Sequence, residues 1–161
     1  GGWLQHASRA AHSPPGVTPV GIGQPAPALD LPDLDGRQHR LTEQRGRRVL
    51  VNFWATWCAP CLKELPALAA AQEKFGEKHA IVLAVAMDEP ERVRRFIADH
   101  GLRLPVLLGD MGPPSTSLKW GDRDEILPFS VLVDGDGRVI AMHRGPLDDA
   151  RIARWLQTGR D

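Results

Sequence analysis

The stretch that decides the fold is VLVNFWATWCAPCLKELPAL, residues 49–68. Its first part belongs to a near-continuous apolar run, residues 47–55, whose composition predicts a strand buried on both faces. Leucines then recur at helical spacing, so we expect a helix over residues 59–75. Cys58 and Cys61, the only two cysteines of the chain, stand where the strand gives way to the helix. A buried strand therefore leads directly into a helix that carries a cysteine pair.

Strand and helix patterns alternate over the rest of the chain. They predict a hairpin within residues 27–41, a strand at 80–88, a helix at 89–101, a short strand at 104–110, one helical turn near Leu118, a hairpin at 128–145, and a last helix at 147–159 that ends at Gly159. A strand–helix–strand crossover requires a parallel pair of strands, whereas a hairpin adds antiparallel ones. We therefore predict a three-layer mixed α/β domain.

The first residues differ in composition from the rest. Residues 1–25 are rich in Gly, Pro, Ala and Ser and show no apolar period, so we predict a flexible lead-in there and a folded domain over residues 26–161. A chain of 161 residues suits one domain with a real core. The sequence has no run of about 20 apolar residues, so we expect no bilayer-spanning segment within it.

The balance of charge excludes some classes of partner. The chain has 20 basic and 20 acidic residues, a formal net charge of zero. Such a balance gives no general attraction to nucleic acid or to an anionic membrane. We therefore expect no nucleic-acid partner, and since no feature points to an obligate oligomer, we expect a monomer.

The cysteine pair has three possible uses, of which two fit poorly. A structural zinc site needs four ligands, and the six histidines at positions 6, 12, 39, 79, 100 and 143 form no close pair. A structural disulfide between Cys58 and Cys61 would close a loop of only two intervening residues and would constrain the unfolded chain very little. We therefore expect no metal site.

The third use, thiol–disulfide exchange, fits the local geometry. Free N–H groups and the dipole at a helix start favour a thiolate at Cys58, which is the nucleophile in disulfide exchange. Cys61, one turn along, can then attack Cys58 and release the substrate. We predict no cofactor beyond the redox-active Cys58–Cys61 disulfide itself.

Four motifs in order resemble a known family. They are GQPAPALDLPDLDG, VNFWATWCAPCLKELP, AVAMDEPERVRRFIADHGLRLPVLLGD and LPFSVLVDGDGRVIAMHRGPLD. Within the thioredoxin superfamily they are similar to the TlpA/ResA-like, also DsbE-like, thiol–disulfide oxidoreductases of bacterial envelopes, over residues 22–158. The resemblance implies a thioredoxin-like three-layer α/β/α fold, with a mixed central sheet, an N-terminal β-hairpin and a central αβ insertion.

The resemblance also implies a substrate-binding surface. Pro128 falls where the family carries a cis-proline that faces the cysteines and bares the backbone of Leu127 to an extended substrate strand. The alternative is an ordinary trans proline at a strand start. Many relatives have threonine or valine in place of Leu127, which bears on substrate preference. Trp57 would pack beside Cys58 and shape the same surface.

Four further residues are expected to shape the active site. Glu64, three residues past Cys61, would tune the cysteine pKa values and exchange protons, unless it is simply a solvated helix glutamate. Asn52 stands where thioredoxins proper have a buried aspartate that accepts a proton, which asparagine cannot do. Ala59 and Pro60, between the cysteines, resemble the reducing members of the superfamily more than the strong oxidants.

We therefore predict an enzyme that reduces disulfides of exported proteins, with apocytochrome c as a candidate substrate. A membrane thiol electron donor would keep it reduced. The resemblance implies the periplasm or cell envelope as its location, and an anchor could precede Gly1. The alternatives are a disulfide oxidant or isomerase, and a non-catalytic module that delivers copper or binds a partner. Peroxidase activity fits less well because the family's peroxidatic cysteines lie in a different motif.

Overall fold

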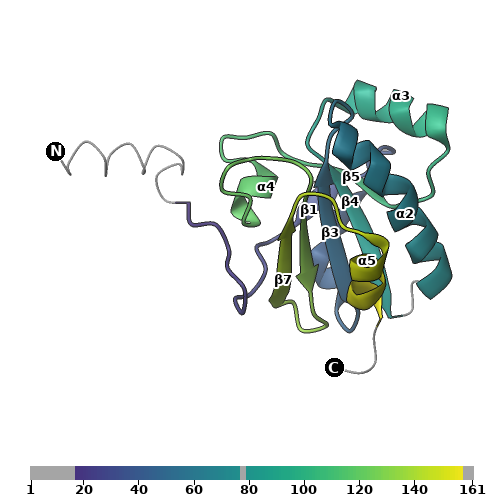
Figure 1. Cartoon of the computed structure of the whole chain (residues 1–161). Helices are drawn as coiled ribbons and strands as arrows, with labels where there is room; N and C mark the ends of the chain where they lie inside the picture. Colours follow the sequence, from purple (N-terminus) through teal and green to yellow (C-terminus); the bar gives the residue numbers. More distant parts are fainter. Residues whose placement is uncertain (1–16, 77–78, 158–161) are drawn as a thin grey trace.

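A computed structural model of the protein describes residues 17–76 and 79–157 (Figure 1). Its centre is a five-stranded sheet in the order β5-β4-β3-β6-β7. Strands β3, β4 and β5 are parallel, and β6 and β7 are antiparallel to their neighbours, which confirms the predicted mixed sheet. The strands are β3 (Arg48–Trp54), β4 (Ala80–Ala86), β5 (Val106–Leu108), β6 (Phe129–Val133) and β7 (Val139–Arg144).

Three helices contribute to the core on one face of the sheet: α2 (Ala59–Phe75), α3 (Pro90–His100) and α5 (Asp149–Leu156). Helices α2 and α5 lie side by side (Figure 1). Their buried side chains, among them Leu65 and Ile152, pack into one cluster with sheet residues such as Leu50. The expected helix over residues 59–75 is confirmed at both bounds.

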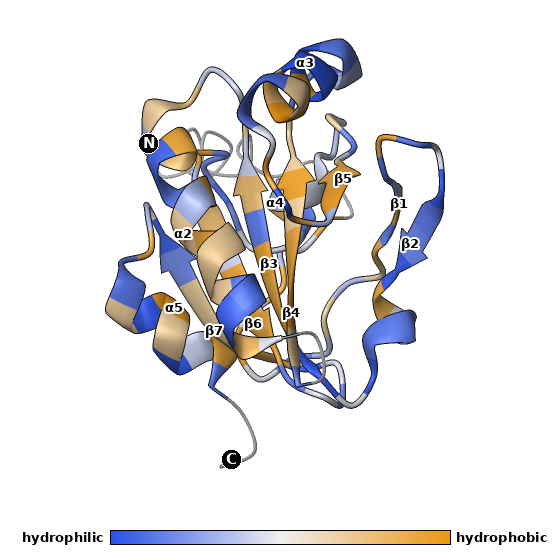
Figure 2. Cartoon of the chain, turned by 90° about the vertical axis from the view of Figure 1, so that its right-hand side faces the viewer, coloured by the Kyte–Doolittle hydropathy of each residue, from blue (hydrophilic) through white to orange (hydrophobic). Residues whose placement is uncertain are grey.

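The opposite face is covered by shorter elements. These are the antiparallel hairpin of β1 (Asp30–Pro32) and β2 (Gln38–Arg40), the 3₁₀ helix η1 (Leu41–Gln44) and the residues around α4 (Thr116–Lys119). They cover strands that Figure 2 shows to be hydrophobic over most of their length. Because both faces are covered, β3 is buried along nearly its whole length, as its apolar run predicts.

Alternation along β3 decides which side chains lie under α2. Val51 and Phe53 point to the face that η1 and the hairpin cover, whereas Leu50 and Trp54 point to the face of α2. Asn52, two residues after Leu50, points to the same face of the sheet, so a polar side chain lies in the core beneath the helix that carries the cysteines.

The two chain ends differ from the sequence prediction. In the described part of the predicted lead-in, the Val20 N–H donates to the Lys119 carbonyl at 3.0 Å and the Gly23 N–H donates to the Val139 carbonyl at 2.8 Å. Contacts with the domain therefore begin before residue 26; residues 1–16 lie outside the described part. The predicted helix end at Gly159 also lies outside the described part; helix α5 ends at Leu156, and the backbone at Gln157 is extended (φ −70°, ψ 119°). Across residues 17–76 and 79–157, no helix is long and apolar enough to cross a membrane.

Candidate active site

Sheet topology brings distant loops to one edge. The loop from Ala55 to Cys58 follows β3, and Leu127 and Pro128 immediately precede β6. Since β6 is antiparallel to β3, with Phe53 opposite Phe129, the start of β6 lies at the same edge as the end of β3. The pairing therefore sets Pro128 across from the residues that lead to the cysteines.

The cysteine pair lies at the start of α2, as predicted. Cys58 is the N-cap residue, and its Cα lies 5.3 Å from that of Cys61, to which it is bonded in a disulfide. Cys58 is 5% exposed and Cys61 is 0% exposed, so an incoming sulfur can reach only the first of them. Ala59 and Pro60, in the first turn, are exposed.

The residues of the predicted substrate surface differ in exposure. Trp57 is 64% exposed, an unusual exposure for so large an apolar ring. The Leu127–Pro128 peptide bond is cis, which confirms the predicted isomer and rules out the trans alternative. Pro128 is buried and Leu127 is half-buried.

Glu64 lies in a buried polar cluster beneath the helix. One of its carboxylate oxygens accepts a hydrogen bond from the Asn52 side-chain amide at 2.7 Å, and the other accepts from the Leu147 backbone N–H at 2.5 Å. The Asn52 amide also donates to the hydroxyl of Ser130 at 3.0 Å. The alternative of a solvated helix glutamate is therefore wrong, because Glu64 is only 3% exposed.

Burial raises the pKa of Glu64, and the hydrogen bonds from Leu147 and Asn52 offset only part of this effect. A carboxyl with a raised pKa is a better proton carrier near neutral pH than an ordinary glutamate. Asn52 is fully buried, and its side-chain amide donates to the Glu64 carboxylate. Glu64 is thus the carboxyl that could accept a proton as the buried aspartate does in thioredoxins proper. A hydrogen bond thus joins two of the residues that were expected to shape the active site.

Sequence reasoning missed Asp88, which holds the loop before the cysteines. One carboxylate oxygen of Asp88 accepts hydrogen bonds from the Thr56 backbone N–H at 2.8 Å and from the Thr56 hydroxyl. The other accepts from the Glu89 N–H at 2.7 Å. An acidic residue two positions after a buried strand that neighbours β3 was the available signal, because the carboxyl ends of parallel strands share an edge.

We expect Asp88→Ala to lower the free energy of unfolding by about 2 kcal/mol, because the Thr56 N–H loses its acceptor. Burial alone would raise the pKa of Asp88, but the hydrogen bonds from Thr56 and Glu89 and the charge of Arg92 lower it. A carboxyl with a lowered pKa stabilises the fold above pH 3.8, and this contribution is lost as the pH falls through the folded pKa.

Urea unfolding of Asp88→Ala and of the parent at neutral pH measures this loss. The exposed neighbour Glu89, whose side chain caps no helix N–H, supplies the matched control Glu89→Ala. Equal stabilities for the Asp88 variant and its control would contradict the assignment.

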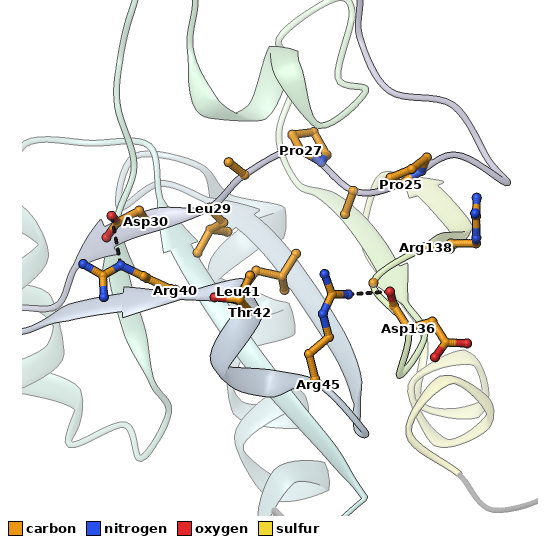
Figure 3. A pocket seen from close by; sticks show the side chains of 13 residues that line it. Pro25, Pro27, Leu29, Asp30, Arg40, Leu41, Thr42, Arg45, Asp136 and Arg138 are labelled. Carbon is orange, nitrogen blue, oxygen red and sulfur yellow. Dashed lines mark hydrogen bonds and ion pairs between the residues drawn. The ribbon is translucent and has the colours of Figure 1, made fainter.

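A separate hollow lies away from the cysteines (Figure 3). It has a volume of about 320 Å³ and lies between residues 25–30, the start of η1 and the β6–β7 turn. Arg40 at its rim pairs with Asp30 at 3.3 Å, and Arg45 donates to the backbone carbonyl of Asp136. Its lining includes neither cysteine, so it is no part of the redox site.

Comparison with known proteins agrees with this geometry. Residues 22–142 match the AhpC/TSA family. The chain is 33% identical over 142 residues to the thiol–disulfide oxidoreductase ResA of Geobacillus thermodenitrificans, which covers 88% of this chain and 79% of the relative.

Solved structures give the same result. A Chlorobium tepidum chain assigned as thiol:disulfide interchange protein DsbE has a TM-score of 0.72 at 29% identity, covering 84% of this chain and 93% of its own. The exposed lipoprotein thioredoxin of Streptococcus pneumoniae has a TM-score of 0.65 at 27% identity, covering 81% of this chain and 98% of its own. The predicted resemblance and the thioredoxin-like fold are thus confirmed. The chain belongs to the AhpC/TSA family and, with its cysteine pair at the head of α2, is a thiol–disulfide oxidoreductase similar to ResA.

Proposed function

We propose that this oxidoreductase works as a reductase of disulfides in exported proteins. The observation that carries the proposal is the cysteine pair at the N-terminus of α2, in which Cys58 is slightly exposed and Cys61 is fully buried. The Cys58 thiolate attacks one sulfur of a substrate disulfide and forms a mixed disulfide. The other substrate sulfur leaves as a thiolate and takes up a proton.

The second step releases the substrate. Cys61 loses its proton, and its thiolate attacks the sulfur of Cys58, so that the Cys58–Cys61 disulfide forms and the remaining substrate sulfur leaves. Two electrons have then passed from the protein to the substrate. Glu64 follows Cys61 by three residues on the same helix, and its raised pKa suits it to accept the Cys61 proton. The Asn52 amide would hold the carboxyl in place.

The substrate is an extended segment of a protein chain. The backbone of Leu127 would pair with that segment as with an added strand, and the exposed ring of Trp57 would cover its apolar side chains. Such binding recognises the substrate mainly through its backbone and depends less on its side chains. It therefore suits an enzyme that acts on several exported proteins, apocytochrome c among them.

The bacterial envelope is the proposed location, and a membrane thiol donor the proposed source of electrons. The similarity to an exposed lipoprotein thioredoxin supports this location. An oxidising compartment does not keep a dithiol reduced, so each turnover requires the Cys58–Cys61 disulfide to be reduced again by a dedicated donor.

The midpoint potential of the cysteine pair tests the direction of electron flow. We expect a value at or below about −220 mV, in the range of reducing family members, because Ala59 and Pro60 separate the cysteines as in those members. Equilibration in graded thiol–disulfide buffers, followed by Trp57 fluorescence, gives the value. A Trp57→Phe variant identifies the signal of this one tryptophan among five. A potential near about −120 mV would show instead an oxidant that installs disulfides.

A further inference from the structure

Asp122 is a buried carboxylate that the proposed exchange chemistry does not use. It lies in the loop between α4 and the Leu127–Pro128 turn and is only 1% exposed. One carboxylate oxygen, Oδ1, accepts a hydrogen bond from the Ile126 backbone N–H at 3.1 Å. The other, Oδ2, is buried and has no hydrogen-bond partner among the described residues. Since a buried polar atom without a partner costs free energy, its retention suggests a role outside stability.

The hydrogen bonds of Asp122 connect α4 to the substrate-facing turn. Its backbone N–H donates to the Ser117 carbonyl at 3.0 Å, and its backbone carbonyl accepts from the Glu125 N–H at 3.1 Å. Because its side chain also accepts from the Ile126 N–H, Asp122 fixes the backbone position of Ile126, two residues before Pro128. Ile126 itself is 68% exposed, so its own side chain contributes little packing and its backbone position depends on this hydrogen bond.

Few charged groups act on this carboxyl. Arg144 of β7 is the nearby cation, but it is already bonded to Asp124 at 2.8 Å. Asp124 and Glu125, in the same loop, are both acidic, and α4 contributes the backbone carbonyl of Ser117. Burial raises the pKa of Asp122 to about 6; the Ile126 N–H and Arg144 lower it, and the two acidic neighbours add to the rise.

We propose that Asp122 is a positioning residue for substrate binding, which holds the Ile126–Pro128 turn ready for the substrate strand and loosens it on protonation. The inference rests on the proposed function, in which this turn receives the substrate. An ionised carboxylate accepts a stronger hydrogen bond from the Ile126 N–H than the neutral acid does. Because Asp122 acts through the turn, it alters how substrate binds and leaves the sulfur chemistry alone.

Replacing the acceptor tests the positioning. For Asp122→Ala we expect the KM for a model protein disulfide such as insulin to rise about tenfold, with kcat little changed. Oxidised glutathione, too small to lie along the turn, should react at the parent rate, and the midpoint potential should stay at the parent value. Arg123→Ala, an exposed change at the next residue, is the matched control and should leave the KM unchanged.

The isosteric variant Asp122→Asn tests protonation and also guards against a variant that fails to fold. Its neutral side-chain oxygen accepts from Ile126 only as weakly as the protonated acid does, so the KM at pH 7.5 should already be raised toward the value that the parent reaches below pH 6. In the parent, the KM should rise as the pH falls through about 6, where the carboxylate takes up its proton. Asp122→Asn has no such proton to gain, so this rise should disappear.

Two results would overturn the inference: a parent-like KM in Asp122→Ala, or the same pH dependence of KM in Asp122→Asn as in the parent. A changed midpoint potential would overturn it too, because Asp122 would then act on the cysteines. Rates are measured in both directions, with the model protein oxidised or reduced. If the parent reduces the oxidised protein poorly, that result counts against the proposed function. The ratio of the KM of Asp122→Ala to that of the parent tests the inference, whichever direction of reaction is measured.

Discussion

Cys58→Ser should abolish thiol–disulfide exchange, with a loss of rate on the order of a thousandfold or more. A serine hydroxyl does not ionise near neutral pH, so no nucleophile remains at the more accessible of the two positions, and Cys61 is fully buried. The fold should survive, because Cys58 is replaced by a side chain of similar size at a helix N-cap, where serine is a favoured residue.

Reduction of a model protein disulfide, followed by non-reducing electrophoresis, measures this loss. The matched variant is Cys61→Ser, which keeps the attacking thiol and removes the resolving one. It should accumulate a mixed disulfide between Cys58 and the substrate, visible as a covalent adduct by mass. Turnover that persists in Cys58→Ser would contradict the assigned nucleophile, and partner binding without any turnover in the parent would favour a docking module.

Glu64→Ala should lower the free energy of unfolding by about 3 kcal/mol, the second large effect. The substitution removes both acceptors of the carboxylate, so the Leu147 N–H is left without a partner and the Asn52 amide keeps only Ser130. It also leaves a void under α2, because Glu64 is buried.

The pH dependence of this loss has a definite sign. Burial raises the pKa of Glu64 above 4.5, so the folded state binds this proton more tightly than the unfolded state. The contribution to stability is fully present below pH 4.5 and is lost as the pH rises through the folded pKa. The difference between the parent and Glu64→Ala should therefore be largest at acid pH and shrink as the pH rises.

Thermal or urea unfolding over a range of pH checks both statements. Lys63→Ala, at the exposed neighbouring position of the same helix, is the control and should change stability by less than about 0.5 kcal/mol. An equal loss in the two variants would show that the buried cluster does not stabilise the fold. A loss that grows as the pH rises would contradict the raised pKa.

Local patterns account for most of the fold that could be predicted. The apolar run over β3 and the leucine spacing of α2 are properties of adjacent residues, and both elements appear where these patterns place them. The C-terminal end of α5 was predicted less well, because the backbone there turns extended at Gln157 without a glycine or proline to mark it. Residues 17–25 were assigned to a lead-in because composition does not reveal the hydrogen bonds that Val20 and Gly23 make.

The site divides in the same way. Cys58 and Cys61 stand in a motif with a helix-start signal, and the resemblance pointed to Glu64 and Pro128. Asp122 carries no such signal, and Asp88 has only its place just past a buried strand; the role of each depends on the backbone N–H that donates to its carboxylate. Burial, which changes the pKa of both carboxyls, is likewise invisible in a list of residues.

The sequence by itself determined the order of strands and helices, the redox pair and its place at the head of a helix, because these depend on periodicity and on spacing over a few residues. Only the tertiary structure decided which distant polar groups meet. Glu64 joins Asn52, 12 residues before it, and Leu147, 83 residues after it. The reason is physical: parallel and antiparallel pairing bring these residues to one edge of the sheet, and packing of α2 over that edge removes them from water.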